Sequence, residues 1–400
     1  MIRKVWPLVA AAVALGIDAY VLAGVLPSIA DSLTTTAAMI GLGVTAFTAA
    51  YAVAGPLLSG RLTRGSTARA LLIALGVFNL GNLITTVAPG IEIFLASRVV
   101  AGAGAGILTA VATATAAASV SENERGRAMA MVTFGLSTGT VAGVPVGMLI
   151  GQSLGWRWTM ALVVAVGVLS MAALAARARA LPPLPTADGA PVFGVLRSGR
   201  TAAGVLTAFL LGVASLGLYT YLLPMADARG LGDWGFALVW AWGIGGVTGS
   251  ALIGRPLDRY GPKGMLLVLP ALLVASFVTV WAFSDPAVWL IAAAVWGAAG
   301  WASVPTVQQA LTQDRPAQAM PIIAFQMAAM YLGSAVGAAL GSSLLAAGTS
   351  AIDLAAWALI PAGPAVLLAG WIGTVALGTR RRAPMGERSE SAHAVCESSA

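Results

Sequence analysis

Apolar stretches of about 20 residues recur along the whole chain, separated by short polar segments. A helix that crosses the ~30 Å hydrocarbon layer of a bilayer needs about this length, and the pattern predicts twelve such helices. The first six are expected at residues 6–30, 38–60, 70–88, 92–118, 128–151 and 157–176. The second six are expected at residues 201–226, 235–254, 264–283, 287–311, 320–346 and 354–378. The sequence therefore predicts an all-α polytopic membrane protein.

Two polar segments divide and end this pattern. Residues 177–200 contain four arginines and a cluster of prolines at Pro182, Pro183 and Pro185, which is typical of a linker outside the membrane. The linker separates an N-terminal six-helix bundle, residues 1–176, from a C-terminal one, residues 201–378. Residues 379–400 are polar and rich in Ser and Glu, so we expect a disordered tail.

The two halves repeat each other weakly. The loop GPLLSGRLTRGSTAR from Gly55 resembles the loop GSALIGRPLDRYGPK from Gly249. Glycines also recur at every fourth position within both the fifth and the eleventh predicted helix. Internal repeats of this kind are common in transporters. We therefore expect two pseudo-symmetric bundles.

Composition and charge agree with a lipid environment: 58% of the residues are hydrophobic, 9% are charged, and the net charge is +7. A basic protein can bind nucleic acid, but nineteen of the 22 lysines and arginines fall on the side that carries both termini. Arg157 and Arg229 lie in the opposite loops, and Arg98 lies within a helix. The positive-inside rule therefore predicts a multi-pass protein of the cell membrane with both termini cytoplasmic and no nucleic-acid partner.

The residue types needed for catalysis or metal binding are scarce. The single histidine and single cysteine, His393 and Cys396, lie in the polar tail. This excludes a His/Cys metal cluster and a Ser/His or Cys/His catalytic set. The sequence also has no GxxxxGK[ST] phosphate loop, so ATP-driven pumping is not expected. We predict no enzyme activity, no metal and no cofactor.

Asp18 interrupts an apolar run from Val5 to Ala30, about 18 Å along its helix and near the middle of the bilayer. A charge at this depth is costly and is usually functional. Asp18 is the only acid within a predicted span, and Arg98 is the only base. In one hypothesis, protonation of Asp18 is coupled to substrate release, with Arg98 stabilising its ionised form or taking over substrate contact. The alternative is a static buried pair that locks two helices together.

Aromatic and amide side chains fall on helices expected to border a central cavity. The candidates are Tyr20, Tyr219, Tyr221, Trp296, Trp301, Gln308, Gln309, Gln326 and Tyr331. Such a lining suits a flat or amphipathic organic molecule. The alternative for each aromatic residue is an anchor at the membrane interface or simple packing.

The fifth predicted helix carries the glycine series Gly135, Gly139, Gly143 and Gly147, with Pro145 between the last two. Glycines at this spacing form a groove in which a neighbouring backbone can approach closely. Pro145 removes one backbone donor, so a bend is expected there. One interpretation is that the fifth helix pivots at this groove during gating. The alternative is that the groove only allows ordinary tight packing.

Three of these patterns resemble the twelve-helix drug:proton antiporters of the major facilitator superfamily, over residues 5–378. The first helix reads GIDAYVLAGVLP from Gly16, similar to that family's acid, aromatic and closing Leu-Pro pattern. Arg98 with the glycines after it resembles the helix-four arginine motif. The glycine run resembles the antiporter motif, although Pro145 follows Gly143 by two residues rather than one, a departure also seen in chloramphenicol and sugar-efflux exporters.

A fourth pattern that resembles this family is the loop signature after the second and eighth helices. Its second copy is complete, with Gly254, Asp258, Arg259, Gly261 and Lys263. The first copy is one residue shorter and lacks the acid. The resemblance implies that Asp258 and Arg259 form a cytoplasmic gate contact, whereas the alternative is a solvated pair of turn charges.

The resemblance implies proton-coupled efflux of a small organic compound, such as a drug or antibiotic, by alternating access. The energy source would be the proton gradient, and the partners would be the substrate, protons and the lipid bilayer, with the protein as a monomer. One alternative keeps the fold and makes the protein a proton-coupled transporter of a sugar or other metabolite, including an importer. A different class, a non-transporting receptor or scaffold, would require an ordered domain outside the membrane, which the sequence does not indicate.

Overall fold

The structure is a computed structural model and describes residues 2–35, 37–184 and 192–381. Within these ranges it is helical and contains no β-strand. Eleven segments of the described part are long and apolar enough to span a membrane. The remaining predicted span is α1 (Ile2–Ser32), the 31-residue helix that carries Asp18. The expectation of an all-α bundle is confirmed, while the predicted disorder of residues 382–400 lies outside the described residues.

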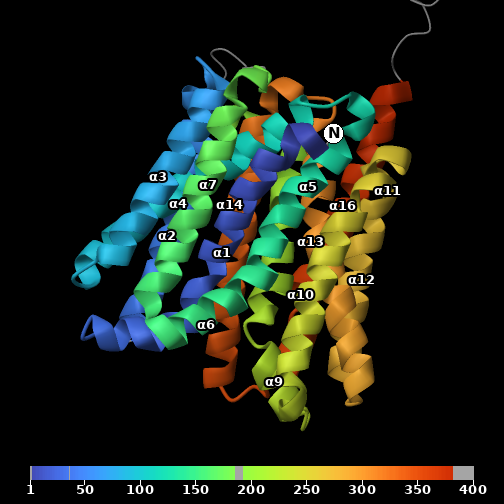
Figure 1. The fold of residues 1–400 in the computed structure, drawn as a ribbon. Helices are drawn as coiled ribbons and strands as arrows, with labels where there is room; N and C mark the ends of the chain where they lie inside the picture. Colours follow the sequence, from blue (N-terminus) through green and yellow to red (C-terminus); the bar gives the residue numbers. More distant parts are fainter. Residues whose placement is uncertain (1, 36, 185–191, 382–400) are drawn as a thin grey trace, which may run out of the picture.

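Each half contributes six spans, which lie side by side (Figure 1). The first half contains α1, α2 (Ala37–Thr63), α3 (Thr67–Val87), α4 (Ile91–Ala118), η1 (Glu122–Glu124), α5 (Arg125–Thr138), η2 (Gly139–Gly143), α6 (Val144–Leu154) and α7 (Trp156–Ala176). Between the halves lie η3 (Ala178–Ala180) and η4 (Val192–Arg197). The second half contains α8 (Gly199–Leu211), η5 (Gly212–Gly217), α9 (Leu222–Ala228), η6 (Gly232–Trp234), α10 (Gly235–Leu252), α11 (Gly254–Tyr260), α12 (Pro262–Ala282), α13 (Pro286–Thr312), η7 (Pro316–Gln318), α14 (Ala319–Ala346), α15 (Asp353–Trp357) and α16 (Leu359–Arg381).

Helix boundaries follow local chemistry. Asp285 caps α13, because its Oδ1 accepts from the backbone N–H groups of Ala287 and Val288 at 2.9 and 3.1 Å. Gly261 has φ +72°, a left-handed conformation that glycine adopts without strain, and it ends α11 directly before α12. The left-handed backbone conformation therefore explains why the loop signature has a glycine at position 261.

Three predicted spans are not single regular helices. The span expected at residues 128–151 consists of α5, the π-helical turn η2 and α6. The seventh span contains a second π-helical turn, η5, and is interrupted at Thr220 and Tyr221 before α9 begins. The span expected at residues 354–378 is interrupted at Ala358, between α15 and α16. A π-helical turn holds one residue more than an α-helical turn and is frequent at functional sites. Hydropathy does not report this change of hydrogen-bond pattern.

The repeat between the halves is visible in how the helices pack. Gly102 of α4 lies against the backbone of Phe47 in α2, so a Cβ there would overlap the Phe47 carbonyl group. Gly245 of α10 lies in the same way against the backbone of Ala294 in α13. Since lipid supplies no hydrophobic drive between helices, such close approach is what stabilises their association.

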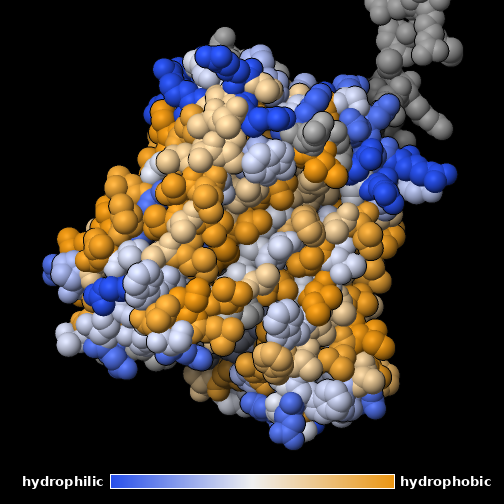
Figure 2. Space-filling view, in the orientation of Figure 1, coloured by the Kyte–Doolittle hydropathy of each residue, from blue (hydrophilic) through white to orange (hydrophobic). Residues whose placement is uncertain are grey.

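The outer surface has an apolar belt between two polar ends (Figure 2). Large apolar side chains such as Leu149, Leu169 and Phe236 are more than half exposed on it. We call the end where α1 begins, α16 ends and η3 and η4 lie the terminal face, and the other end the opposite face (Figure 1). The molecule is a multi-pass membrane protein.

Candidate functional site

Asp18 and Arg98, selected from the sequence as the only charges within predicted spans, lie in contact. Arg98 Nη1 donates to Asp18 Oδ1 at 2.9 Å, and the two side chains are 1% and 0% exposed. The pair joins α1 to α4 across 80 residues of sequence. A fully buried ion pair requires further hydrogen bonds to offset the loss of hydration.

Asn82 of α3 supplies those bonds. Its Nδ2 donates to Asp18 Oδ2 at 3.3 Å, and its Oδ1 accepts from Arg98 Nη1 at 3.0 Å. The ring of Phe47 in α2 lies under the guanidinium group, 4.5 Å from the Arg98 Cζ to the ring centroid. The face of an aromatic ring attracts a cation, most strongly when both are desolvated. Four helices of the first half thus converge on one charged pair.

The contacts of the pair match its charges. Both Asp18 carboxylate oxygens accept hydrogen bonds, and the arginine charge faces a carboxylate. Removing one of the two charges would leave the other unmatched in a low-dielectric interior, where an unmatched charge is costly.

The glycine groove faces α1, the helix that carries Asp18. A Cβ at Gly135, Gly139, Gly143 or Gly147 would overlap, in order, Val9, Val13, Ile17 and Val21 of α1. Thr140 Oγ1 also donates to the Gly16 carbonyl at 3.3 Å. Pro145 lies in the first turn of α6, just beyond η2, and its side chain lies outside the described residues. The groove and the π-helical turn therefore hold α1 next to its buried acid.

A second charged contact joins the two halves at the terminal face. Asp258 of α11 accepts from Arg127 of α5 twice, from the backbone N–H at 3.1 Å and from Nε at 2.9 Å. The Asp258 side chain is 9% exposed. It thus binds both a guanidinium group and the N-terminal turn of a helix, each of which attracts an anion. We call this contact the terminal latch.

The other residues of the loop signature surround the latch in different ways. A Cβ at Gly254 would lie 2.8 Å from the Arg127 Cα, so this glycine permits the approach of α11 to α5. Arg259 is exposed and stacks on Tyr260, 5.3 Å from its ring centroid. Lys263 is exposed in the first turn of α12. Asp258 therefore makes the contact between halves, and Arg259 does not take part in it.

The contact between the halves continues from the latch toward mid-depth. Ser137 of α5 and Ser250 of α10 are hydrogen-bonded at 2.8 Å, and a Cβ at Gly243 would lie 2.9 Å from a methyl carbon of Val141. The interface thus follows α5 and η2 over about 21 Å. Beyond η2, α6 packs on α1 and α7 of its own half. The two halves are therefore closed together on the side of the terminal face.

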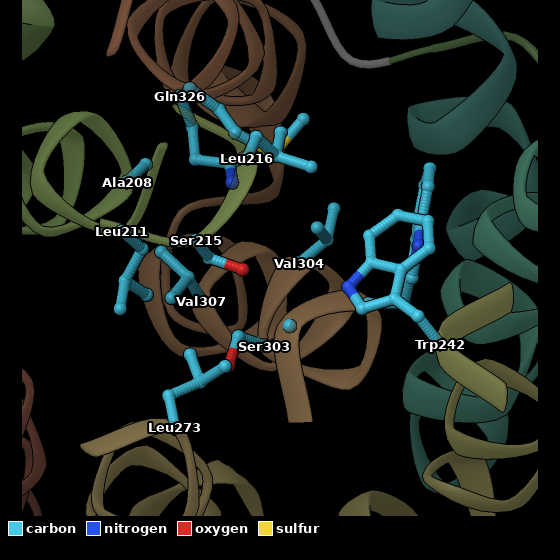
Figure 3. Close-up of a pocket in the computed structure, with 13 residues that line it drawn as sticks. Ala208, Leu211, Ser215, Leu216, Trp242, Leu273, Ser303, Val304, Val307 and Gln326 are labelled. Atoms are coloured by element: carbon cyan, nitrogen blue, oxygen red, sulfur yellow. The ribbon is translucent and has the colours of Figure 1, made fainter. Parts of the chain in front are cut away.

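A pocket lies within the second half, lined by residues of α8, η5, α10, α12, α13 and α14 (Figure 3). Trp301 and Gln326, two of the predicted cavity residues, belong to its lining. Trp242 also lines it and stacks on Tyr219, a third predicted residue, with ring centroids 3.9 Å apart. Gln308 Nε2 donates to Gln326 Oε1 at 3.2 Å, which fixes the amide at the pocket edge. Four predicted residues thus gather at this place.

The other predicted cavity residues are spread more widely. Trp296 Nε1 donates to Ser215 Oγ at 2.9 Å behind the pocket, and Tyr331 packs edge-on against Tyr51 of the first half. Gln309 lies at the junction of the halves, where a Cβ at Gly126 would be 2.5 Å from its Oε1. Tyr221 donates to the Ala338 carbonyl and lines a separate apolar cavity beside α14 and α16. The Tyr20 side chain lies outside the described residues.

Three residues of these sites were not singled out from the sequence. Asn82 carries no charge, but an amide in an apolar span is itself unusual and is a signal of the same kind as Asp18. Arg127 was counted only as one of the basic residues that set topology. Trp242 was one of twelve tryptophans without a distinguishing local pattern.

Comparison with known proteins identifies the family. The sequence profile described as Major Facilitator Superfamily matches residues 8–321. The chain is 31% identical over 350 residues to the chloramphenicol resistance protein of Streptomyces lividans, covering 84% of this chain and 88% of that one. It is 30% identical over 341 residues to a chloramphenicol efflux pump of Mycobacterium tuberculosis, covering 80% of each chain. It is 29% identical over 352 residues to an uncharacterised transporter of Bacillus subtilis, covering 84% and 87%.

Solved structures agree on the fold. The transporter FucP in its outward conformation matches with a TM-score of 0.72 at 17% identity, covering 92% of this chain and 97% of that one. The proton:xylose symporter XylE matches with a TM-score of 0.71 at 15% identity, covering 96% of each. From profile, relatives and fold together, this chain belongs to the Major Facilitator Superfamily and is a membrane transporter, not an enzyme.

Proposed function

We propose that the protein exports a small organic compound, such as a drug or antibiotic, in exchange for protons. The observation that carries this proposal is the buried Asp18–Arg98 pair, 2.9 Å apart and bridged by Asn82. A carboxylate in a membrane interior is costly to keep and is typical of proton relays. The proton gradient would then supply the energy, with no cofactor and with a monomer as the working unit.

The coupling follows from the two charge states of the pair. When Asp18 takes up a proton, Arg98 loses its anionic partner, and the helices that the pair joins lose a reason to stay together. When Asp18 releases the proton, the pair reforms. Because α1 is also held in the glycine groove of α5 and η2, a change at Asp18 acts directly on the helix that forms the interface between the halves. Protonation would thus bias the equilibrium between two arrangements of the halves.

The direction of transport is supported by three features. Relatives named for chloramphenicol efflux and resistance share about 30% of their residues with this chain. The sequence predicts nineteen of the 22 basic residues on the side of both termini, which favours a cytoplasmic terminal face. The latch closes that face, and a fold neighbour is in an outward conformation. We infer that the described state opens away from the cytoplasm, the state from which an exporter releases substrate.

The experiment is a measurement of proton flux in energised inside-out vesicles. A panel of chloramphenicol, other antibiotics, dyes and sugars is added to vesicles with the wild type, Asp18→Asn or Asp31→Asn. Asp31 is an exposed acid on the same helix and serves as the matched control. We expect a compound to discharge the proton gradient in the wild type and in Asp31→Asn, and to have no effect in Asp18→Asn.

Asparagine is nearly isosteric with aspartate and can still accept from Arg98, so the variant is expected to fold; size-exclusion chromatography checks this. Equal discharge by Asp18→Asn and the wild type would overturn Asp18 as the coupling group. Discharge by sugars alone would support a metabolite transporter in place of drug efflux. Acidification of the vesicle lumen when the compound is added would indicate symport in place of antiport.

A further inference from the structure

We propose that the pocket in the second half is a subsite for an uncharged hydrogen-bond acceptor group on an aromatic substrate, such as a nitro or carbonyl group. This inference rests on the proposed function and narrows its substrate class. It starts from two indole groups. Trp242 and Trp301 are 2% and 4% exposed, and neither Nε1 has a hydrogen-bond partner within the described residues.

An indole N–H can only donate a hydrogen bond. A buried donor without an acceptor is unfavourable, so two of them at one pocket predict a ligand that supplies acceptors. In Figure 3 the indole nitrogen of Trp242 lies on the side of the ring that faces Val304 and Ser303. Trp301 meets Trp242 edge-on at a ring-centroid distance of 6.4 Å, and both rings line the pocket. The Nε1 edge of Trp301 lies next to Gly246 of α10, so Trp242 is the donor that faces the pocket most directly.

One of the remaining polar groups supplies a further donor. Ser215 Oγ accepts from Trp296 Nε1, so the Ser215 hydroxyl hydrogen remains as a further donor. Ser303 donates to the Ala299 carbonyl of its own helix at 2.7 Å. None of the lining residues that the structure describes is acidic or basic. A charged group would therefore enter without a counter-charge, at a high cost.

The apolar lining favours an aromatic carrier for the acceptor. Leu211, Leu216, Leu273, Val304 and Val307 surround the polar groups. The cavity volume is about 30 Å³, which is room for roughly two water molecules. In this state the pocket therefore admits a substituent rather than a whole drug, and a ring would follow only after the walls separate.

A sugar fits this pocket less well than an acceptor-bearing aromatic compound. Each sugar hydroxyl carries a hydrogen that must itself find an acceptor when buried. The wall formed by Trp242 and Trp301 offers only donors. The acceptor side chains in the described lining are the two serines and Gln326, whose Oε1 already accepts from Gln308 Nε2. The pocket therefore favours an acceptor-bearing aromatic compound over a sugar.

The test uses a matched pair of ligands, chloramphenicol and its analogue in which the aryl nitro group is reduced to an amine. Binding to the purified protein in lipid nanodiscs is measured by isothermal titration calorimetry. We expect the wild type to bind the nitro compound about tenfold more tightly. Trp242→Phe and Trp301→Phe keep the ring and remove the N–H, so each should weaken nitro binding about three- to tenfold and leave the amine unchanged.

Trp371→Phe, an exposed tryptophan of α16, is the matched control and should bind like the wild type. The ligand pair tests the inference on the wild type alone, should either pocket variant fail to fold. Equal binding of nitro and amine compounds, or of wild type and both Phe variants, overturns the inference; so does absence of nitro binding. Compound-driven proton discharge that is unchanged in both variants would leave export standing without this subsite, whereas selective binding without proton discharge would leave the subsite without export.

Discussion

The interiors of the two halves differ in chemistry although their helices pack alike. The first half buries an ion pair, Asp18–Arg98, within a cage of hydrogen bonds. The second half buries the indole groups of Trp242 and Trp301, which meet edge-on, and the amide of Gln326, with no acidic or basic residue in the described lining. In both halves glycines bring equivalent helix backbones into contact, as at Gly102 and Gly245. The repeat therefore preserves the scaffold and leaves the interior free to differ.

The halves also differ at the terminal face. The second half supplies Asp258, which holds the N-terminal turn of α5 in the first half. The corresponding loop of the first half has no acid in its signature. The terminal latch therefore has one carboxylate, from the second half, and the first-half loop supplies no counterpart.

The sharpest test of this comparison removes one charge from the first half. Arg98→Met leaves Asp18 buried beside Asn82 without a cation, and we expect a loss of about 3–5 kcal/mol in stability. The double variant Asp18→Asn/Arg98→Met removes both charges and should recover most of it. Thermal unfolding in detergent, followed by circular dichroism, measures both. If Arg98→Met unfolds at the same temperature as the wild type, the ion pair does not contribute to the stability of the first half.

A smaller effect is expected where the halves are alike. Gly139 of η2 and Gly337 of α14 are counterparts in the repeat, and each lies against a neighbouring backbone, at the Val13 and Val213 carbonyl groups. Alanine at either position must separate two helices, at a cost of about 1–3 kcal/mol. Gly363 of α16 has open space where a Cβ would be added and is the control, because alanine there should stabilise the helix slightly. If the stabilities of Gly139→Ala and Gly337→Ala differ from each other by more than the control differs from the wild type, the two positions are not equivalent.

The smallest effect concerns the terminal latch. Asp258→Asn removes the charge that binds Arg127, and we expect the closed state to lose about 1–2 kcal/mol, because the contact is only partly buried. Ser137→Cys in a Cys396→Ser background reports opening, through its rate of labelling by a membrane-impermeant maleimide. The rate should rise about five- to thirtyfold.

The control for the latch is Arg259→Gln, which changes an exposed charge on the same helix without a bond between the halves. It should label at the wild-type rate. A rise of the same size in both variants would mean that general charge at this face, and not the Asp258 contact, keeps the halves closed.

The spans were predictable because hydrophobicity and length decide them. The prediction of residues 92–118 agrees with α4, Ile91–Ala118, and that of residues 157–176 agrees with α7, Trp156–Ala176. The π-helical turn at Gly139–Gly143 was not predictable, because it changes which backbone groups pair while leaving hydropathy unchanged. Composition thus predicts that a helix is present, but it does not predict the local hydrogen-bond pattern of that helix.

The site was predictable where a single residue violates the rules of its environment. Asp18 and Arg98 stand out because charge in lipid is costly, and they lie in contact. Asn82 was missed because only charged residues were selected within the spans, although a buried amide is a weaker signal of the same kind. Arg127 was missed because it is one of many arginines at the ends of the helices. Trp242 faces its pocket through tertiary packing alone, which no sequence spacing encodes.

The π-helical turn η2 has a consequence for the history of this chain. Pro145 stands one residue later than in the motif that its helix resembles, and η2, which ends at Gly143, lies directly before it. A π-helical turn accommodates one inserted residue without shifting the helix on either side. Length variation among relatives should therefore be placed at Gly139–Gly143 when sequences are aligned, inside a membrane span and not in the loops where insertions are ordinarily sought.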